Sequence, residues 1–221
     1  NSTSIVEKFM KEDERIILVR HEEYNEGTMI SRNEAIRMAK GKYITVLDGD
    51  DTLIHKDILK YSLNVAQMGD IDVVEFHFAP YDKNNKRLPN GHIHDYLPYI
   101  MHQPELQYKF FYFKDFNDHQ RAFLCRTIWG KLIKNEIFQK ALDNIPSKYL
   151  NDYIVNFEDA MVMISLYQVA NSYYCLRQLG YYYALGNDRR GNIVRKKGKC
   201  RIREGVITNF DHIKFMNFLL D

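Results

Sequence analysis

The stretch Tyr43-Ile44-Thr45-Val46-Leu47-Asp48-Gly49-Asp50-Asp51 joins a short apolar run to three carboxylates. Its first five residues are rich in β-branched and aromatic side chains, which predicts a buried strand over 43–47. Three carboxylates at the end of such a strand repel one another unless a positive group lies beside them. Because Mg²⁺ and Mn²⁺ prefer oxygen ligands, a divalent cation is the usual solution. The stretch therefore predicts a metal site at a strand end, where open α/β sheets also bind ligands.

A solvated acidic turn is the alternative interpretation of Asp48-Gly49-Asp50-Asp51, and the four residues alone do not decide between the two. An EF-hand calcium loop is excluded, because Leu53 stands where that loop needs glycine and Leu59 where it needs a bidentate acid. The choice depends on the elements around the turn.

Helical and strand patterns alternate along the first part of the chain. The expected elements are helices over 4–10, 28–40 and 56–68, and strands over 16–19, 43–47 and 72–79. Alternation of this kind is typical of parallel strands joined by helical crossovers. We therefore expect an α/β fold with a mixed, mainly parallel sheet flanked by helices.

The second half of the chain is harder to interpret. The expected elements are a short helix over 135–142, a helix over 157–170, one or two strands over 173–185 and a final amphipathic helix over 204–220. The aromatic stretch 97–126 gives no clear pattern. His92 and His94 lack a third ligand nearby, so a surface pair is favoured over a zinc site.

The composition excludes several classes of protein. The three cysteines, Cys125, Cys175 and Cys200, are too widely spaced for a disulfide framework or a zinc motif, which favours a reducing compartment. No apolar run approaches the roughly 20 residues that span a bilayer, and no signal peptide is evident. The net charge of +2 is not diagnostic of any partner. We expect a cytoplasmic protein that binds no nucleic acid.

Three blocks of sequence, the first of which includes the acidic turn, are informative through their order along the chain and the spacing between them. The first comprises Ser31-Arg32-Asn33-Glu34-Ala35, Ala39-Lys40-Gly41-Lys42-Tyr43-Ile44 and Leu47-Asp48-Gly49-Asp50-Asp51; the second is Trp129-Gly130-Lys131-Leu132-Ile133; the third is Phe157-Glu158-Asp159, followed by a helix and Tyr181-Tyr182-Tyr183. Together they closely resemble the family 2 glycosyltransferases, which have a GT-A fold. The resemblance implies a catalytic domain over 1–190, with a basic loop and a C-terminal helix over 191–221.

One departure from the family pattern concerns the start of the chain. Members of the family normally begin with a strand carrying a Pro-x-Tyr-Asn-like segment, and a second strand follows that ends in acidic residues for the nucleotide base. Neither is present here. The resemblance therefore implies a chain that lacks the first strand–helix unit and half of the nucleotide pocket.

The resemblance also implies a reaction. A sugar would pass from a nucleotide-diphosphate sugar to a hydroxyl acceptor, a saccharide or another alcohol, with inversion at the anomeric carbon. Asp48-Gly49-Asp50 has the family's Asp-x-Asp form: Asp48 would lie near the ribose, Asp50 would bind Mn²⁺ or Mg²⁺, and Asp51 would assist. The metal would stabilise the leaving diphosphate as a Lewis acid.

The third block supplies the expected base. Asp159 would take the proton of the acceptor hydroxyl, with Glu158 in support, since a carboxylate within hydrogen-bond reach can do this. The alternative is that both acids stand at a helix start because the helix dipole favours negative charge there.

Other side chains are expected around the donor and acceptor. Arg32 and Asn33 would flank the nucleotide, although a surface salt bridge would also explain Arg32. Trp129 and Lys131 would shape the acceptor side, or Trp129 would simply belong to the core.

The basic segment 189–203 carries eight Lys or Arg residues and no acids. It is expected either to be a solvated loop, to close over the diphosphate through Arg189 or Arg190, or to dock on anionic lipid at a membrane surface.

Two other functions compete with the transferase. The first is a truncated or non-catalytic module that binds a nucleotide sugar within a larger protein. The second is a metal-dependent nucleotidyltransferase, which would need a phosphate loop rich in Gly and Lys or Arg that is not evident here.

Overall fold

The computed structural model describes residues 2–21, 26–82, 84, 86–87, 99–111, 127–154, 157–184 and 218. Several predictions lie outside these residues: the basic segment 189–203 with Arg189, the pair His92 and His94, and all of the helix 204–220 except Phe218. Among the residues that the structure describes, no helix combines the length and the apolar composition needed to cross a bilayer.

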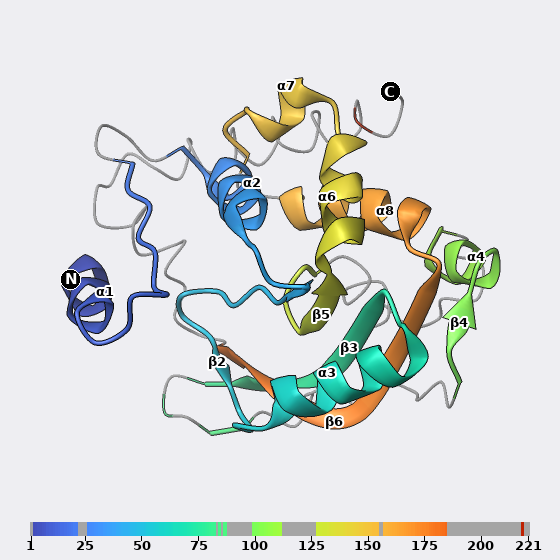
Figure 1. The fold of residues 1–221 in the computed structure, drawn as a ribbon, viewed down its shortest axis with the longest axis horizontal. Helices are drawn as coiled ribbons and strands as arrows, with labels where there is room; N and C mark the ends of the chain where they lie inside the picture. Colours follow the sequence, from blue (N-terminus) through green and yellow to red (C-terminus); the bar gives the residue numbers. More distant parts are fainter. Residues whose placement is uncertain are drawn as a thin grey trace.

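The described part of the chain is built around one mixed sheet (Figure 1). Its strands are β1 (Tyr43–Ile44), β2 (Thr52–Leu53), β3 (Val73–Tyr81), β4 (Met101–His102), β5 (Lys131–Lys134) and β6 (Ser172–Ala184). They pair in the order β1-β5-β3-β6-β2, and β4 also pairs with β6. The long strand β6 therefore pairs with three other strands, and one of them, β3, runs parallel to it.

The prediction of a mixed sheet flanked by helices is confirmed, but the prediction that parallel pairs predominate is wrong. In the described sheet only β3 and β6 are parallel, and the other pairs are antiparallel. β5, which follows β1 by almost ninety residues, inserts antiparallel between β1 and β3. Alternating helices and strands indicate the order along the chain, and they do not reveal that a later strand separates two earlier ones.

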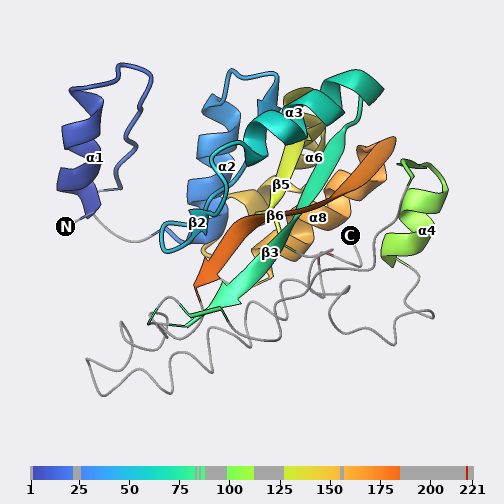
Figure 2. The same cartoon turned by 90° about the horizontal axis from the view of Figure 1, so that it is seen from below.

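Two of the predicted strands are wrong or shortened. Residues 16–19 form no strand, and Ile17 is 64% exposed. No described strand lies beside this segment to complete a hydrogen-bonded ladder. Of the predicted strand 43–47 only β1 is paired, and residues 45–47 lead from it to the acidic turn outside any strand. The helix before residue 16, α1 (Ser2–Met10), has no buried residue and lies away from the sheet (Figures 1 and 2).

The other described helices agree with their predictions to within a few residues where one was made. They are α2 (Thr28–Met38), α3 (Ile58–Gly69), α4 (Glu105–Phe111), α6 (Asn135–Asp143), α7 (Ser147–Leu150) and α8 (Glu158–Val169). α3 covers one face of β3 and β6, and α8 lies on the opposite face (Figure 2). Gly180 permits the close approach of α3, because a Cβ there would lie 2.3 Å from Cγ1 of Ile58.

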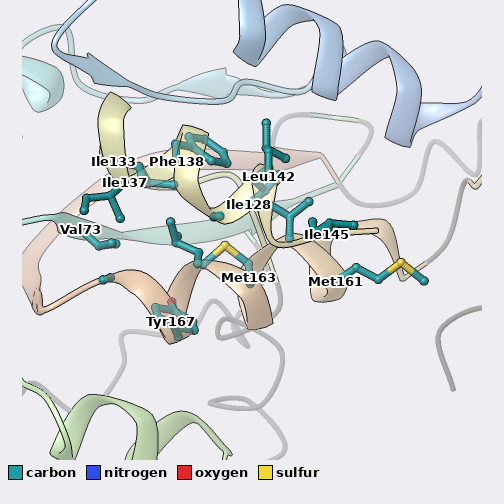
Figure 3. Packing of buried hydrophobic residues seen from close by; sticks show 14 of the residues in the cluster. Val73, Ile128, Ile133, Ile137, Phe138, Leu142, Ile145, Met161, Met163 and Tyr167 are labelled. Atoms are coloured by element: carbon teal, nitrogen blue, oxygen red, sulfur yellow. The ribbon is translucent and has the colours of Figure 1, made fainter. Parts of the chain in front are cut away.

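The larger core fills the face of the sheet that α6 and α8 cover (Figure 3). Ile133 of β5 and Val73 of β3 meet Phe138 of α6 and Met163 of α8 there, and Ile128 packs among them from the segment before β5. Removing such side chains from water contributes about 25 cal/mol per Å² of apolar surface. This packing fixes the start of α8 against the sheet, which places two of the predicted site residues.

Candidate active site

The guanidinium of Arg32 brings three carboxylates together. Its Nη2 lies 2.6 Å from Oδ1 of Asp48, in the turn after β1. Its Nη1 lies 3.2 Å from Oε1 of Glu158 and also pairs with Oδ1 of Asp159, both at the start of α8. Predicted residues from two blocks more than 100 positions apart therefore meet at one side chain. The surface salt bridge considered for Arg32 is excluded, since its side chain is only 17% exposed.

The backbone around α2 and α8 explains why Arg32 faces this way. The N–H groups of Thr28 and Met29 donate to the carbonyl of Ile154, at 3.1 and 3.2 Å, and so tie the first turn of α2 to the segment before α8. Phe157 then adopts a left-handed conformation, with φ of 66°, and turns the chain into α8. A non-glycine residue is uncommon in that region of backbone space, so this turn is a specific feature of the site.

Burial governs the charge state of the cluster. It raises the pKa of the Asp159 carboxyl above its ordinary value, against the lowering effects of Arg32 and of the Ile128 N–H, which donates to Oδ2 of Asp159 at 3.3 Å. Burial lowers the pKa of Arg32, but the charges of Asp159, Asp48 and Glu158 outweigh it and the net shift is upward. Arg32 therefore stays charged, while Asp159 binds a proton more readily than an exposed aspartate does.

The acidic turn is held on its other side by β6. The hydroxyl of Tyr181 donates to Oδ2 of Asp51 at 2.7 Å and accepts the N–H of Asp48 at 3.3 Å, while the N–H of Ala184 donates to Oδ1 of Asp51 at 2.9 Å. Burial raises the pKa of Asp51, and these two donors oppose the shift. Asp51 is thus occupied in fastening the turn, which fits the assisting role expected of it.

Asp50 differs from both neighbours because its side chain is exposed and has no hydrogen bond or ion pair with another described residue. No group of three His, Cys, Asp or Glu residues in the described ranges could hold a metal ion unaided. Mg²⁺ is often bound through one or two carboxylates, with substrate phosphates and waters completing its shell. An exposed aspartate between two tethered ones fits that requirement, so the residues present fit a divalent ion that binds together with a phosphorylated ligand.

Comparison with known proteins places this arrangement in a family. The model named "Glycosyl transferase family 2" matches residues 1–141, more than half of the chain. This chain belongs to glycosyl transferase family 2. The turn that bears Asp48 and Asp50 and the helix that bears Arg32 lie within the matched range, whereas α8 lies beyond it.

Two individual relatives of this family 2 chain are also named as glycosyltransferases. The "Glycosyltransferase GlyG" of Streptococcus pneumoniae is 27% identical over 249 aligned positions, which cover all of this chain and 73% of GlyG. An uncharacterized glycosyltransferase of Methanocaldococcus jannaschii is 37% identical over 70 residues, 32% of this chain and 24% of that protein. The resemblance expected from the three blocks is confirmed, and glycosyl transfer is the activity that this family membership supports.

Solved structures bear on the fold of this family 2 chain. A structure of S. aureus TarS residues 1–349 superposes with a TM-score of 0.57 at 19% identity, covering 82% of this chain and 47% of TarS. A second TarS structure gives a TM-score of 0.58 at 18% identity, over 87% and 30% of the two chains. The chain spans less than half the length of either TarS chain. At this identity the likeness shows the fold alone, and it confirms the GT-A-like α/β architecture.

Three predicted residues of this family 2 site lie elsewhere or face inward. Trp129 is 4% exposed, and its ring stacks 4.6 Å from Tyr181 and 5.1 Å from Tyr183, so the tryptophan supports the tyrosine that holds Asp51. The side-chain oxygen of Asn33 is buried and has no hydrogen-bond partner among the described residues. Lys131 is fully buried beneath the site instead of lining the acceptor side. Binding roles for Trp129 and Asn33 stay predictions, and Arg189 lies outside the described residues.

Sequence reasoning missed two contacts of this family 2 site. One is the Tyr181 hydroxyl on Asp51, because nothing in the sequence pairs the run Tyr181-Tyr182-Tyr183 with the acidic turn. The other is the Ile128 N–H on Asp159, which is a backbone donor and leaves no signal in residue identity.

Proposed function

We propose that this chain transfers a sugar from a nucleotide-diphosphate sugar to a hydroxyl acceptor, with a divalent cation as cofactor and with inversion at the anomeric carbon. The observation that carries the proposal is the bridge through Arg32, because it joins the turn that would hold the diphosphate to the carboxylate that would act as base. Donor and acceptor chemistry would thus share one site.

Asp159 is the proposed general base. Its Oδ1 pairs with Arg32 and its Oδ2 accepts the Ile128 N–H, so the carboxylate has a defined orientation. The acceptor oxygen attacks the anomeric carbon from the face opposite the diphosphate, Asp159 takes its proton, and the bond from the anomeric carbon to the phosphate oxygen breaks. A single displacement with one base gives inversion. A positioned base typically contributes about 10²–10⁴-fold to the rate.

The donor side is assigned to the acidic turn. Asp50 would hold Mn²⁺ or Mg²⁺, which supplies Lewis-acid stabilisation of the departing diphosphate when bound. Asp48 would lie toward the ribose, Asp51 would keep the turn on β6, and Glu158 would support the start of α8 through Arg32. Asn33 and Arg189 complete the proposed donor site, and Trp129 would support it through Tyr181.

We further propose a cytoplasmic location, with contact to a membrane surface through the basic segment as the alternative. The free, buried thiol of Cys175 is consistent with a reducing compartment. Flotation of the purified chain with anionic vesicles, compared with neutral ones, would separate the two locations.

A donor screen tests the function. The chain is incubated with a panel of nucleotide-diphosphate sugars and Mn²⁺, and the release of nucleoside diphosphate is measured with and without EDTA. We expect release from one donor class, abolished by EDTA. Tight, Mn²⁺-dependent binding of a donor without any release, even with alcohol acceptors present, would instead support the non-catalytic module.

A further inference from the structure

A charged pair lies buried beneath the active site. The side chain of Lys131 is 0% exposed, and its Nζ lies 3.1 Å from Oε2 of Glu75. The two residues stand opposite one another in the ladder of β3 and β5. The hydroxyl of Tyr173, on β6, donates to the same Glu75 oxygen at 2.8 Å. The pair occupies the face of the sheet that the larger core covers, where apolar residues would ordinarily stand.

Fold stability alone does not account for such a pair. Replacing a buried ion pair with well-packed apolar side chains is often neutral or stabilising, because both charges lose their hydration on folding. A buried pair is therefore weak evidence for a stabilising role. The other contacts of Lys131 indicate what else it does.

Lys131 also holds the segment that runs into β5. Its Nζ donates to the carbonyl oxygen of Thr127 at 2.7 Å and lies 3.4 Å from the Thr127 hydroxyl. The carbonyl of Thr127 and the N–H of Ile128 belong to one planar peptide unit and point in opposite directions. Fixing the carbonyl on the ammonium therefore fixes the direction of the N–H, which donates to Oδ2 of Asp159.

Contacts on both sides of this peptide unit fix the path of the segment that leads into β5. The Ile128 side chain is 1% exposed and packs in the core between α6 and α8 (Figure 3). Two residues later, the carbonyl of Gly130 accepts the N–H of Phe76 at 2.9 Å, which ties the segment to β3. Core packing and the hydrogen bond to β3 thus fix the path of the segment. The contact of Lys131 with the Thr127 carbonyl fixes the orientation of the Thr127–Ile128 peptide plane about that path.

We propose that Lys131, held by Glu75, is a positioning residue for sugar transfer: it orients the Thr127–Ile128 peptide so that the Ile128 N–H fixes the Asp159 carboxylate. The proposal rests on the proposed function, in which Asp159 is the base. Lys131 itself touches neither substrate in this arrangement. Its positive charge also lowers the pKa of Asp159, in the same sense as the Ile128 N–H.

The rival explanation is that Lys131 only neutralises Glu75, and a double variant separates the two. Lys131→Met leaves the buried Glu75 without its counter-charge, which is expected to lower the Tm. Adding Glu75→Gln removes that charge and still offers the Tyr173 hydroxyl an acceptor. In the double variant the Tm recovers, while the contact with Thr127 remains absent. Glu75→Gln alone keeps Lys131 but removes the carboxylate that holds it, so it measures the effect of losing Glu75 by itself.

The readouts are the Ile128 amide and turnover with the donor panel and Mn²⁺. In the double variant we expect a shifted Ile128 amide resonance with faster hydrogen exchange, and a fall in kcat of about 10²-fold, the cost of a roughly 1 Å misplacement. The donor KM should change by less than about twofold, because donor contacts are untouched. Recovery of both Tm and wild-type kcat in the double variant would show that Lys131 only balances charge, and would overturn the proposal.

Asp159→Asn distinguishes failure of this inference from failure of the proposed function. If it retains normal turnover, Asp159 is not the base and the proposed function fails. If it abolishes turnover while the double variant keeps wild-type kcat, only the role of Lys131 fails. The wild-type chain provides a test that needs no variant to fold: its Ile128 amide must be protected from hydrogen exchange, and an unprotected amide overturns the proposal.

Discussion

The two acidic regions of the site use their charges in different ways. In the turn after β1 each aspartate has its own surroundings: Asp48 pairs with Arg32, Asp51 accepts two hydrogen bonds from β6, and Asp50 is exposed. At the start of α8 both acids share one guanidinium. An exposed carboxylate remains available to a cation that arrives with its ligand, whereas a buried one has a raised pKa and suits proton transfer. In the proposed function, the turn would therefore serve the donor and α8 the acceptor.

Replacing the α8 acid has the largest expected effect. Asp159→Asn keeps the shape of the side chain and its contact with Ile128, but it cannot take a proton at the acceptor hydroxyl. We expect kcat to fall by about 10²–10⁴-fold, with Mn²⁺-dependent donor binding unchanged. Initial rates and calorimetric titration of the donor measure the two quantities. Normal turnover would remove the proposed distinction between the two acidic regions.

Asp50→Asn should weaken metal-dependent donor binding at the acidic turn. Loss of the one exposed charge in the turn weakens the binding of a hard cation, so the Mn²⁺-dependent part of donor affinity should fall by about tenfold or more, equivalent to about 1.4 kcal/mol. Affinity measured without metal should stay the same. The control is Asp57→Asn, a nearby aspartate outside the turn. Unchanged Mn²⁺-dependent affinity in Asp50→Asn would contradict the assignment of Asp50.

Arg32→Gln should affect both acidic regions, because it removes the positive charge that pairs with carboxylates in each of them. Arg32 lowers the pKa of Asp159, so its loss should raise that pKa further. The base is active only when ionised. The acidic limb of the pH–rate profile, already above the ordinary aspartate value of about 4, should therefore move to higher pH. A limb that stays in place would mean that Arg32 does not control this carboxylate.

Tyr181→Phe should have the smallest effect. It removes the hydrogen bonds that the Tyr181 hydroxyl makes with Asp51 and with the N–H of Asp48. The Ala184 N–H still holds the other Asp51 oxygen, and the ring can still stack on Trp129. We expect a loss of about 1–2 kcal/mol in the free energy of unfolding and a modest fall in Mn²⁺-dependent donor affinity. Thermal melts and donor titrations measure both. Tyr182→Phe, one position away on the opposite face of β6, is the matched control.

Much of the site could be predicted from residues near one another along the chain. Three features of the site are local patterns that the sequence places correctly: the apolar run before Asp48, the carboxylates that follow it and the acids at the start of α8. The resemblance to the family then linked them across more than 100 positions. The contacts that tune them were not predictable: the hydroxyl of Tyr181 and the N–H of Ile128 acquire their roles only through the folded arrangement.

The sequence by itself determined which chemical groups this protein has and where helices α2, α3, α6 and α8 lie, because side-chain chemistry and the periodicity of apolar residues are local properties. Only the tertiary structure decided the direction and neighbours of the strands, since hydrogen-bonded partners come from distant segments and β5 inserts between two earlier strands. The same long-range packing brought Arg32 to Asp159 and buried Lys131 against Glu75. Charge states and orientations at the site follow from that packing, because burial and the nearest opposite charge set them.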